Sequence, residues 1–131
     1  MAAKCNGLRI LMIDDNGDDQ AFVRYALEKS GAGRKVYAVH DPMEAIGYLC
    51  GKGEYADRDR FPVPNVVLCD LKMPGMDGFD FLRWLKRHPD CSVIPTIIFS
   101  NSGLPSDVRE AYRLGANAYI RKPSSLAQML G

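Results

Sequence analysis

Five polar side chains follow short apolar segments of this sequence, at the points where predicted β-strands end. These residues are Asp14, Asp15, Asp70, Ser100 and Lys122. Because the carboxyl ends of parallel strands lie along one edge of a sheet, we expect the five side chains to converge there. Each residue alone has an ordinary explanation, such as a carboxylate that caps a turn. Their occurrence together at successive strand ends is much more specific and indicates a functional site.

The chemistry expected of such a site is the transfer of a phosphoryl group. Two carboxylates about 4 Å apart repel each other by roughly 4 kcal/mol at an effective dielectric constant of about 20. Lys122 offsets one charge, and Mg²⁺, which prefers oxygen ligands, would offset more. In this chemistry Asp70 is the predicted nucleophile and forms an acyl phosphate. Lys122 and Mg²⁺ would stabilise the transferring oxygens, and Ser100 would donate a hydrogen bond to the phosphate.

Five apolar segments are predicted to be the strands that position these side chains. They span residues 8–13, 35–39, 65–70, 95–99 and 118–120. Nearly continuous apolar runs suit strands that are buried on both faces of a parallel sheet. Their alternation with helical patterns predicts one α/β domain over residues 1–131, with a doubly wound five-stranded parallel sheet and helices on both faces. The order expected of such a sheet is the flavodoxin-like order 2-1-3-4-5.

A helix is predicted after each strand, and residues 50–64 are predicted to form a surface loop that delays the return to the sheet. Asp18 and Asp19 are expected to cap or begin the first helix, where the helix dipole favours carboxylates. The pair Asp41-Pro42 predicts the start of the second helix, with Asp as N-cap. Ser124 or Ser125 is predicted to cap a last helix, of which the sequence holds only about two turns.

The amino-acid composition excludes several classes of protein. The chain has 131 residues, of which 47% are hydrophobic, so it can form one domain with a full core. A net charge of +1 argues against a general nucleic-acid or membrane surface. The four cysteines are widely spaced and form no CxxC pair, which argues against a zinc site. The apolar segment at residues 8–13 is too short to span a membrane, and we expect a cytoplasmic protein with reduced thiols.

Several motifs give the sequence a clear resemblance to a known family. The acid pair follows Ile-Leu-Met-Ile, Asp70 lies in Val-Val-Leu-Cys-Asp-Leu-Lys-Met-Pro-Gly-Met-Asp-Gly, and Ser100 ends Ile-Ile-Phe-Ser. Gly115-Ala116 precedes Tyr-Ile-Arg-Lys-Pro, which contains Lys122. The sequence therefore resembles a receiver domain of a two-component response regulator over nearly its whole length. The Asp-Asp-Asn start, the segment 50–64 and Gly-Ala-Asn-Ala-Tyr are similar to single-domain regulators paired with phytochrome-type histidine kinases.

The resemblance implies a phosphoacceptor and a metal site. Asp70 would take the phosphoryl group from a phosphohistidine on a sensor histidine kinase. Asp15 would bind Mg²⁺ directly, and Asp14 directly or through water. Asp70 and the backbone carbonyl of Lys72 would complete the protein ligands.

It also implies a switch. Lys122 would pair with the phosphate through a segment whose Lys122-Pro123 bond is cis, a form that X-Pro bonds tolerate. Ser100 would move toward the phosphate, and Tyr119 would swing inward as it does. Ser100 stands where most of the family has Thr, but the hydroxyl is kept. The resemblance implies a downstream protein partner and leaves a homodimer open, with no contact to nucleic acid or membrane from this chain.

Three alternative functions compete with this interpretation. A phosphatase of the haloacid dehalogenase type needs a second Asp two residues after the nucleophile, but Lys72 is found there, so we expect no turnover of external substrates. A flavodoxin-like cofactor binder needs a Ser-, Thr- and Gly-rich loop after the first strand, where this chain has four Asp. The third is an inactive receiver that acts only as a protein-binding module. The last helix is short for the family, which leaves the dimer surface and a further effector domain open.

Overall fold

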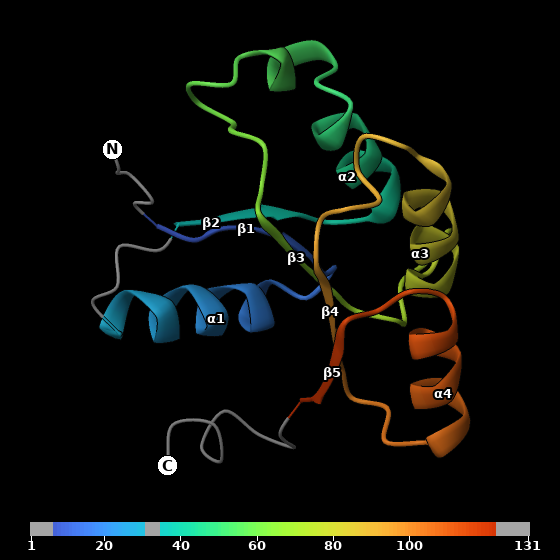
Figure 1. Cartoon of the computed structure of the whole chain (residues 1–131). Helices are drawn as coiled ribbons and strands as arrows, with labels where there is room; N and C mark the ends of the chain where they lie inside the picture. Colours follow the sequence, from blue (N-terminus) through green and yellow to red (C-terminus); the bar gives the residue numbers. More distant parts are fainter. Residues whose placement is uncertain (1–6, 31–34, 123–131) are drawn as a thin grey trace.

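The computed structural model describes residues 7–30 and 35–122, and within them five parallel strands form one sheet in the order β2-β1-β3-β4-β5. The strands are β1 (Arg9–Ile13), β2 (Lys35–Val39), β3 (Val66–Cys69), β4 (Thr96–Ser100) and β5 (Ala118–Arg121). The helices are α1 (Gly17–Lys29), α2 (Pro42–Leu49), α3 (Gly78–Arg87) and α4 (Pro105–Arg113), with a short 3₁₀ helix, η1 (Gly53–Ala56). The predicted strand order is confirmed (Figure 1).

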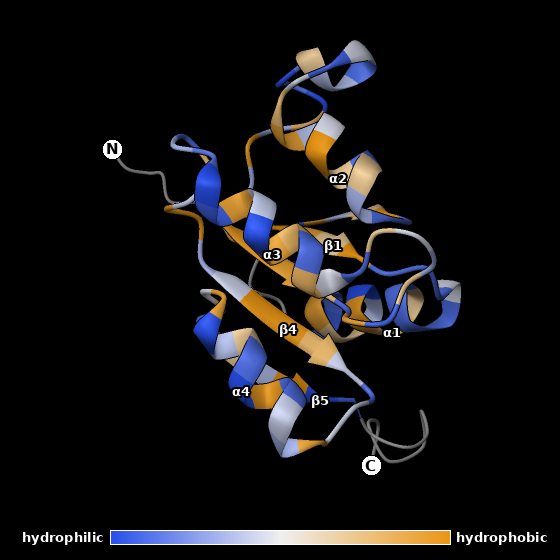
Figure 2. Ribbon diagram, turned by 90° about the vertical axis from the view of Figure 1, so that its right-hand side faces the viewer, coloured by the Kyte–Doolittle hydropathy of each residue, from blue (hydrophilic) through white to orange (hydrophobic). Residues whose placement is uncertain are grey.

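The described helices cover both faces of the sheet. On one face, α2, α3 and α4 pack on a core that includes Leu11, Val67 and Ile98 from the strands. On the other face, α1 contributes Val23 to a smaller core with Met12. The strands are mostly apolar, whereas the outward sides of the helices are largely hydrophilic (Figure 2). The predicted fifth helix and the Lys122-Pro123 bond lie outside the described residues.

Local sequence signals account for most helix ends. The Asp41 carboxylate accepts a hydrogen bond from the backbone N–H of Glu44, and Pro42 is the first residue of α2, as predicted. At α1, however, the N-cap is Asn16, whose side chain accepts from the N–H groups of Asp18 and Asp19. The prediction was that the two aspartates cap or begin the helix. They begin it but do not cap it.

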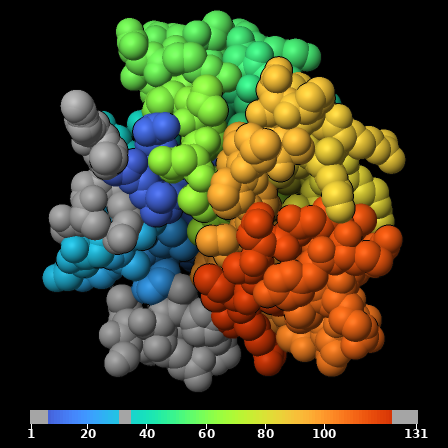
Figure 3. All heavy atoms as spheres, in the orientation of Figure 1, coloured from blue at the N-terminus to red at the C-terminus, as the bar shows by residue number. Residues whose placement is uncertain are grey.

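Residues 50–64 are more than the surface loop that was predicted. They contain η1, and Tyr55 and Phe61 lie partly buried against Tyr48 of α2, with ring centroids 4.8 and 6.0 Å from that of Tyr48. The Arg58 guanidinium donates to the backbone carbonyls of Tyr48 and Leu49, which satisfies carbonyl groups at the end of α2. In the space-filling view this segment, in green, forms one end of the molecule (Figure 3).

One glycine allows the start of α3 to approach the end of β3. The Gly78 N–H donates to the carbonyl of Leu71 at 3.0 Å. A Cβ atom at Gly78 would overlap the backbone carbonyl oxygen of Asp70 and lie 2.8 Å from the Cα of Leu71. Only a residue without a side chain fits here, so the path of the chain just after Asp70 depends on Gly78.

We predict that Gly78→Ala destabilises the protein by about 1–3 kcal/mol, because the new methyl group must displace backbone atoms. The matched control is Gly47→Ala in α2, where nothing lies within 4 Å of the added Cβ. That control should instead stabilise the helix by about 0.5–1 kcal/mol. Denaturant unfolding of both variants measures the difference. A Gly78→Ala variant as stable as the parent protein would contradict the close approach.

Candidate phosphoryl-acceptor and metal site

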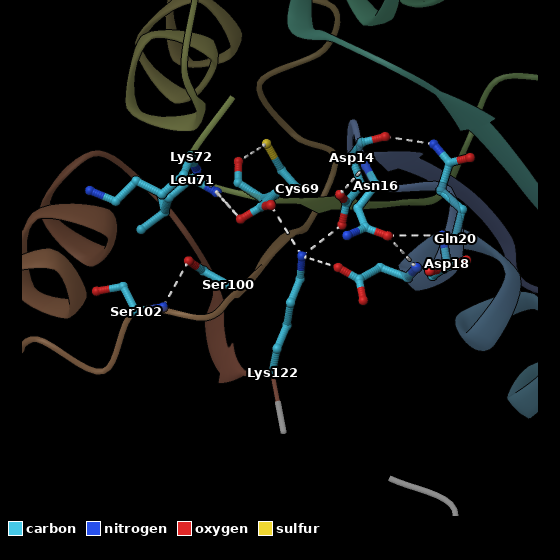
Figure 4. A network of polar contacts seen from close by, with 12 residues as sticks. Asp14, Asn16, Asp18, Gln20, Cys69, Leu71, Lys72, Ser100, Ser102 and Lys122 are labelled. Carbon is cyan, nitrogen blue, oxygen red and sulfur yellow. Dashed lines mark hydrogen bonds and ion pairs between the residues drawn. The ribbon is translucent and has the colours of Figure 1, made fainter. Parts of the chain in front are cut away.

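Asp70 directly follows β3 at the carboxyl edge of the sheet, and its side chain is almost completely buried, with 7% of the residue exposed. The two carboxylate oxygens have different surroundings. Oδ1 accepts hydrogen bonds from the backbone N–H groups of Leu71 at 2.7 Å and Lys72 at 3.4 Å. Oδ2 instead lies 3.1 Å from the ammonium nitrogen of Lys122 (Figure 4).

The acid pair lies at the end of the neighbouring strand, β1. Asp14 is buried with 1% of the residue exposed, whereas Asp15 is exposed. Because β1 pairs with β3, the acid pair lies close to Asp70. One oxygen from each of the three carboxylates lies within 4.8 Å of the others. The expected convergence of Asp14, Asp15 and Asp70 is therefore present in the structure.

Lys122 follows β5, at the opposite end of the sheet from β2, and its side chain reaches across the edge to the acidic residues (Figure 4). Its Nζ lies 2.9 Å from Asp14, 3.1 Å from Asp70 and 2.7 Å from Asp19. An ammonium group has three N–H donors, so each donor has one carboxylate acceptor. Asp19, in the first turn of α1, was not predicted to belong to the site.

Burial and charge act in opposite directions on these groups. Burial would lower the pKa of Lys122, but its hydrogen bonds to Asp19 and Asp14 and the charge of Asp70 outweigh burial, and the pKa is raised. Burial raises the pKa of Asp14, and the hydrogen bonds from Lys122 and from the backbone of Asn16 only partly offset that rise. Lys122 is therefore firmly protonated. Burial disfavours the ionised form of Asp14, and the contact with Lys122 does not fully compensate for that burial.

The donor set fits a hard divalent cation. Asp14, Asp15 and Asp70 offer only oxygen ligands. Asp14 and Asp70 share one ammonium group that also contacts Asp19. Mg²⁺ is commonly bound through one or two carboxylates, with water and phosphate oxygens completing its shell. The backbone carbonyl of Lys72 stays a predicted ligand, since no contact in the described residues tests it. The Lys72 side chain is 69% exposed, and its Nζ lies 4.0 Å from Asp107.

The Ser100 hydroxyl is fully buried at the end of β4. Its Oγ accepts a hydrogen bond from the N–H of Ser102 at 3.2 Å, and no hydrogen bond joins it to Asp70 among the described residues. The Tyr119 hydroxyl donates to the backbone carbonyl of Ser102 at 2.8 Å, and its ring is partly buried against the main core. Ser100 and Tyr119 are therefore joined through the backbone of one residue.

Residues 10–131 match the model of the family described as the response regulator receiver domain. The chain belongs to this family. The resemblance identified in the sequence is confirmed. Within residues 7–30 and 35–122, no helix is both long and apolar enough to cross a membrane.

The chain is similar to individual response regulators of known sequence or structure. It is 31% identical to the response regulator Rcp1 of Synechocystis sp. over 120 residues, which cover 92% of this chain and 80% of Rcp1. The crystal structure of the phosphorylated cyanobacterial phytochrome response regulator RcpA is similar, with a TM-score of 0.85, 34% identity and coverage of 94% and 86% of the two chains. The Mn²⁺-bound form of Rcp1 gives a TM-score of 0.82 at 30% identity, with coverage of 93% and 86%. That form of Rcp1 holds a divalent metal ion.

We predict that Lys122→Met lowers the free energy of unfolding by about 3–5 kcal/mol, because buried carboxylates lose their cation. Mg²⁺ should stabilise this variant more than the parent protein, since the metal then replaces the missing charge and stabilises by binding the folded state. Denaturant unfolding with and without Mg²⁺ measures both effects. Lys52→Met, which removes an exposed lysine, is the control and should change neither quantity. An equal gain from Mg²⁺ in Lys122→Met and the parent would contradict the shared charge balance.

Proposed function

We propose that the protein is the phosphoacceptor switch of a two-component system, in which Asp70 takes a phosphoryl group from a phosphohistidine of a sensor histidine kinase. The observation that carries this proposal is the buried Asp70 carboxylate, with one oxygen on backbone N–H groups and the other beside Lys122 and the acid pair. The similarity to RcpA, a phytochrome response regulator whose phosphorylated form is known, supports a kinase of the phytochrome type.

The two oxygens of Asp70 would have separate tasks in the transfer. The N–H groups of Leu71 and Lys72 hold Oδ1, so Oδ2 is the oxygen that attacks phosphorus. A P–O bond forms as the P–N bond of the phosphohistidine breaks, and the electron pair of that bond stays on the imidazole nitrogen. The Lys122 N–H that now faces Oδ2 would then donate to a phosphoryl oxygen. Mg²⁺ held by Asp14, Asp15, Asp70 and the Lys72 carbonyl would neutralise charge on the transferring oxygens.

Ser100 and Tyr119 would carry the signal away from the site. An acyl phosphate has more acceptor oxygens and more charge than a carboxylate. To donate to it, the Ser100 hydroxyl must reorganise its contact with the N–H of Ser102, whose carbonyl accepts from Tyr119. The phosphoryl group would thereby shift the balance between two arrangements of the loop after β4. Tyr119 would report that change on the surface around α4 and β5.

The proposed role is a switch and not an enzyme that turns over external substrates. Its partners would be a sensor histidine kinase and a downstream protein, with a cytoplasmic location, and a homodimer stays open. Phosphoryl acceptance and loss would both occur on Asp70 of the same chain. The runner-up function, an inactive receiver that only binds a protein, makes the opposite prediction for Asp70.

We predict that phosphoramidate, which like phosphohistidine contains a P–N bond, adds one phosphoryl group to the protein in the presence of Mg²⁺. Intact mass spectrometry measures the gain. The gain should be lost in Asp70→Asn and in a chelator, and it should persist in Asp90→Asn, which removes an exposed carboxylate. In the same samples, NMR signals of Tyr119 and Ser102 should shift only when Asp70 is phosphorylated.

The outcomes separate the two candidate functions. Absence of a mass gain with phosphoramidate and with a panel of phosphorylated histidine kinases would contradict the phosphoacceptor role and favour the binding module. A gain that survives Asp70→Asn would move the acceptor to another residue. A gain on Asp70 with unchanged Tyr119 signals would keep the acceptor but contradict the proposed path of the signal.

A further inference from the structure

Asp19 stands apart from the other carboxylates that contact Lys122. Asp14 and Asp70 both belong to the group of three carboxylates that could hold a metal ion, whereas Asp19 does not. Among the described residues, Asp19 is thus the one acceptor of Lys122 that a bound metal would leave free. It also makes the shortest of the three contacts, at 2.7 Å from Nζ.

The local structure holds Asp19 firmly in that position. It lies in the first turn of α1, and its N–H donates to the side chain of Asn16 at 3.0 Å. The N–H of Asn16 in turn donates to Oδ1 of Asp14 at 2.9 Å, so the turn before α1 links the Asp14 carboxylate to the backbone of Asp19. The positive end of the helix dipole favours a carboxylate in this turn. The Asp19 side chain is 22% exposed, so it is less buried than Asp14.

Lys122 and a metal ion would compete for the same carboxylates. In both Asp14 and Asp70, Oδ1 accepts from backbone N–H groups and Oδ2 faces Lys122. A cation that takes Oδ2 of Asp14 displaces a hydrogen bond of the buried ammonium group, and a cation beside Asp70 competes with Lys122 for the charge of that carboxylate. An ammonium group that loses its acceptors in a buried site is costly, unless another carboxylate remains beside it.

We propose that Asp19 is a positioning residue that holds Lys122 when the metal occupies Asp14 and Asp70, and thereby strengthens metal binding without being a ligand. With Asp19 present, Lys122 can give up its hydrogen bonds to Asp14 and Asp70 and still stay near Asp70. There it is ready to donate to a phosphoryl oxygen. Without that charge, Lys122 holds Asp14 and Asp70 more tightly, and the metal must compete harder. This inference rests on the proposed metal-assisted function of the site, and it assigns to Asp19 a role that acts through Lys122.

The test measures Mn²⁺ binding to the whole chain by electron paramagnetic resonance, with no phosphodonor present. Asp19→Asn keeps an oxygen acceptor but removes the charge, and it should weaken Mn²⁺ binding about tenfold, as expected for residues that orient metal ligands. The matched control is Asp18→Asn, which removes the same charge from the same helical turn at an exposed residue that has no contact with Lys122 among the described residues. The control should bind Mn²⁺ as the parent protein does.

A double-mutant cycle with Lys122→Met shows whether Asp19 acts through the lysine. In that background, Asp19→Asn should weaken Mn²⁺ binding less than threefold, because there is no ammonium group to hold. Equal losses with and without Lys122, or equal losses in Asp18→Asn and Asp19→Asn, would overturn the role of Asp19 and leave the metal site intact. A parent protein that binds no Mn²⁺ would overturn the metal site and this inference together. Failure of Asp70 phosphorylation alone would contradict the proposed function without changing these affinities.

Discussion

The ammonium group of Lys122 holds the site together, because it is the one cation in contact with Asp14, Asp19 and Asp70 among the described residues. These carboxylates lie at the end of β1, in the first turn of α1 and at the end of β3, and they would repel one another without Lys122. One lysine cannot neutralise all of them, and the exposed Asp15 adds a further negative charge beside Asp14 and Asp70. The resulting excess of negative charge makes the site suited to a divalent cation and, with the cation bound, to the oxygens of a phosphoryl group.

The sheet places these charged residues beside the loop after β4, whose conformation would change on phosphorylation. β1, β3 and β5 bring the charged residues to one edge, and the close approach at Gly78 sets the chain path just after Asp70. On the other side of the site, Ser102 contacts both Ser100 and Tyr119 through its backbone. A new group on Asp70 that attracts Ser100 would therefore act on a loop that also holds an aromatic residue of β5.

Much of this arrangement could be predicted, since the end of a buried strand is visible in the sequence as an apolar run followed by a polar residue. That rule located Asp70 and Lys122, and the family resemblance assigned their expected roles. It could not locate Asp19, because contact with Lys122 depends on how α1 packs on the sheet, where Val23 joins the smaller core. Nor did the irregular spacing of Tyr55 and Phe61 reveal that residues 50–64 pack on α2.

We propose that a metal ion and Lys122 divide the carboxylates between them. The direct test is a crystal structure of the protein with Mn²⁺, in which anomalous scattering locates the ion. We expect one anomalous peak among the oxygens of Asp14, Asp15 and Asp70, with Nζ of Lys122 still in hydrogen-bond contact with Asp19. A peak bound to other residues, or a Lys122 side chain that has left Asp19 when Mn²⁺ is bound, would contradict it.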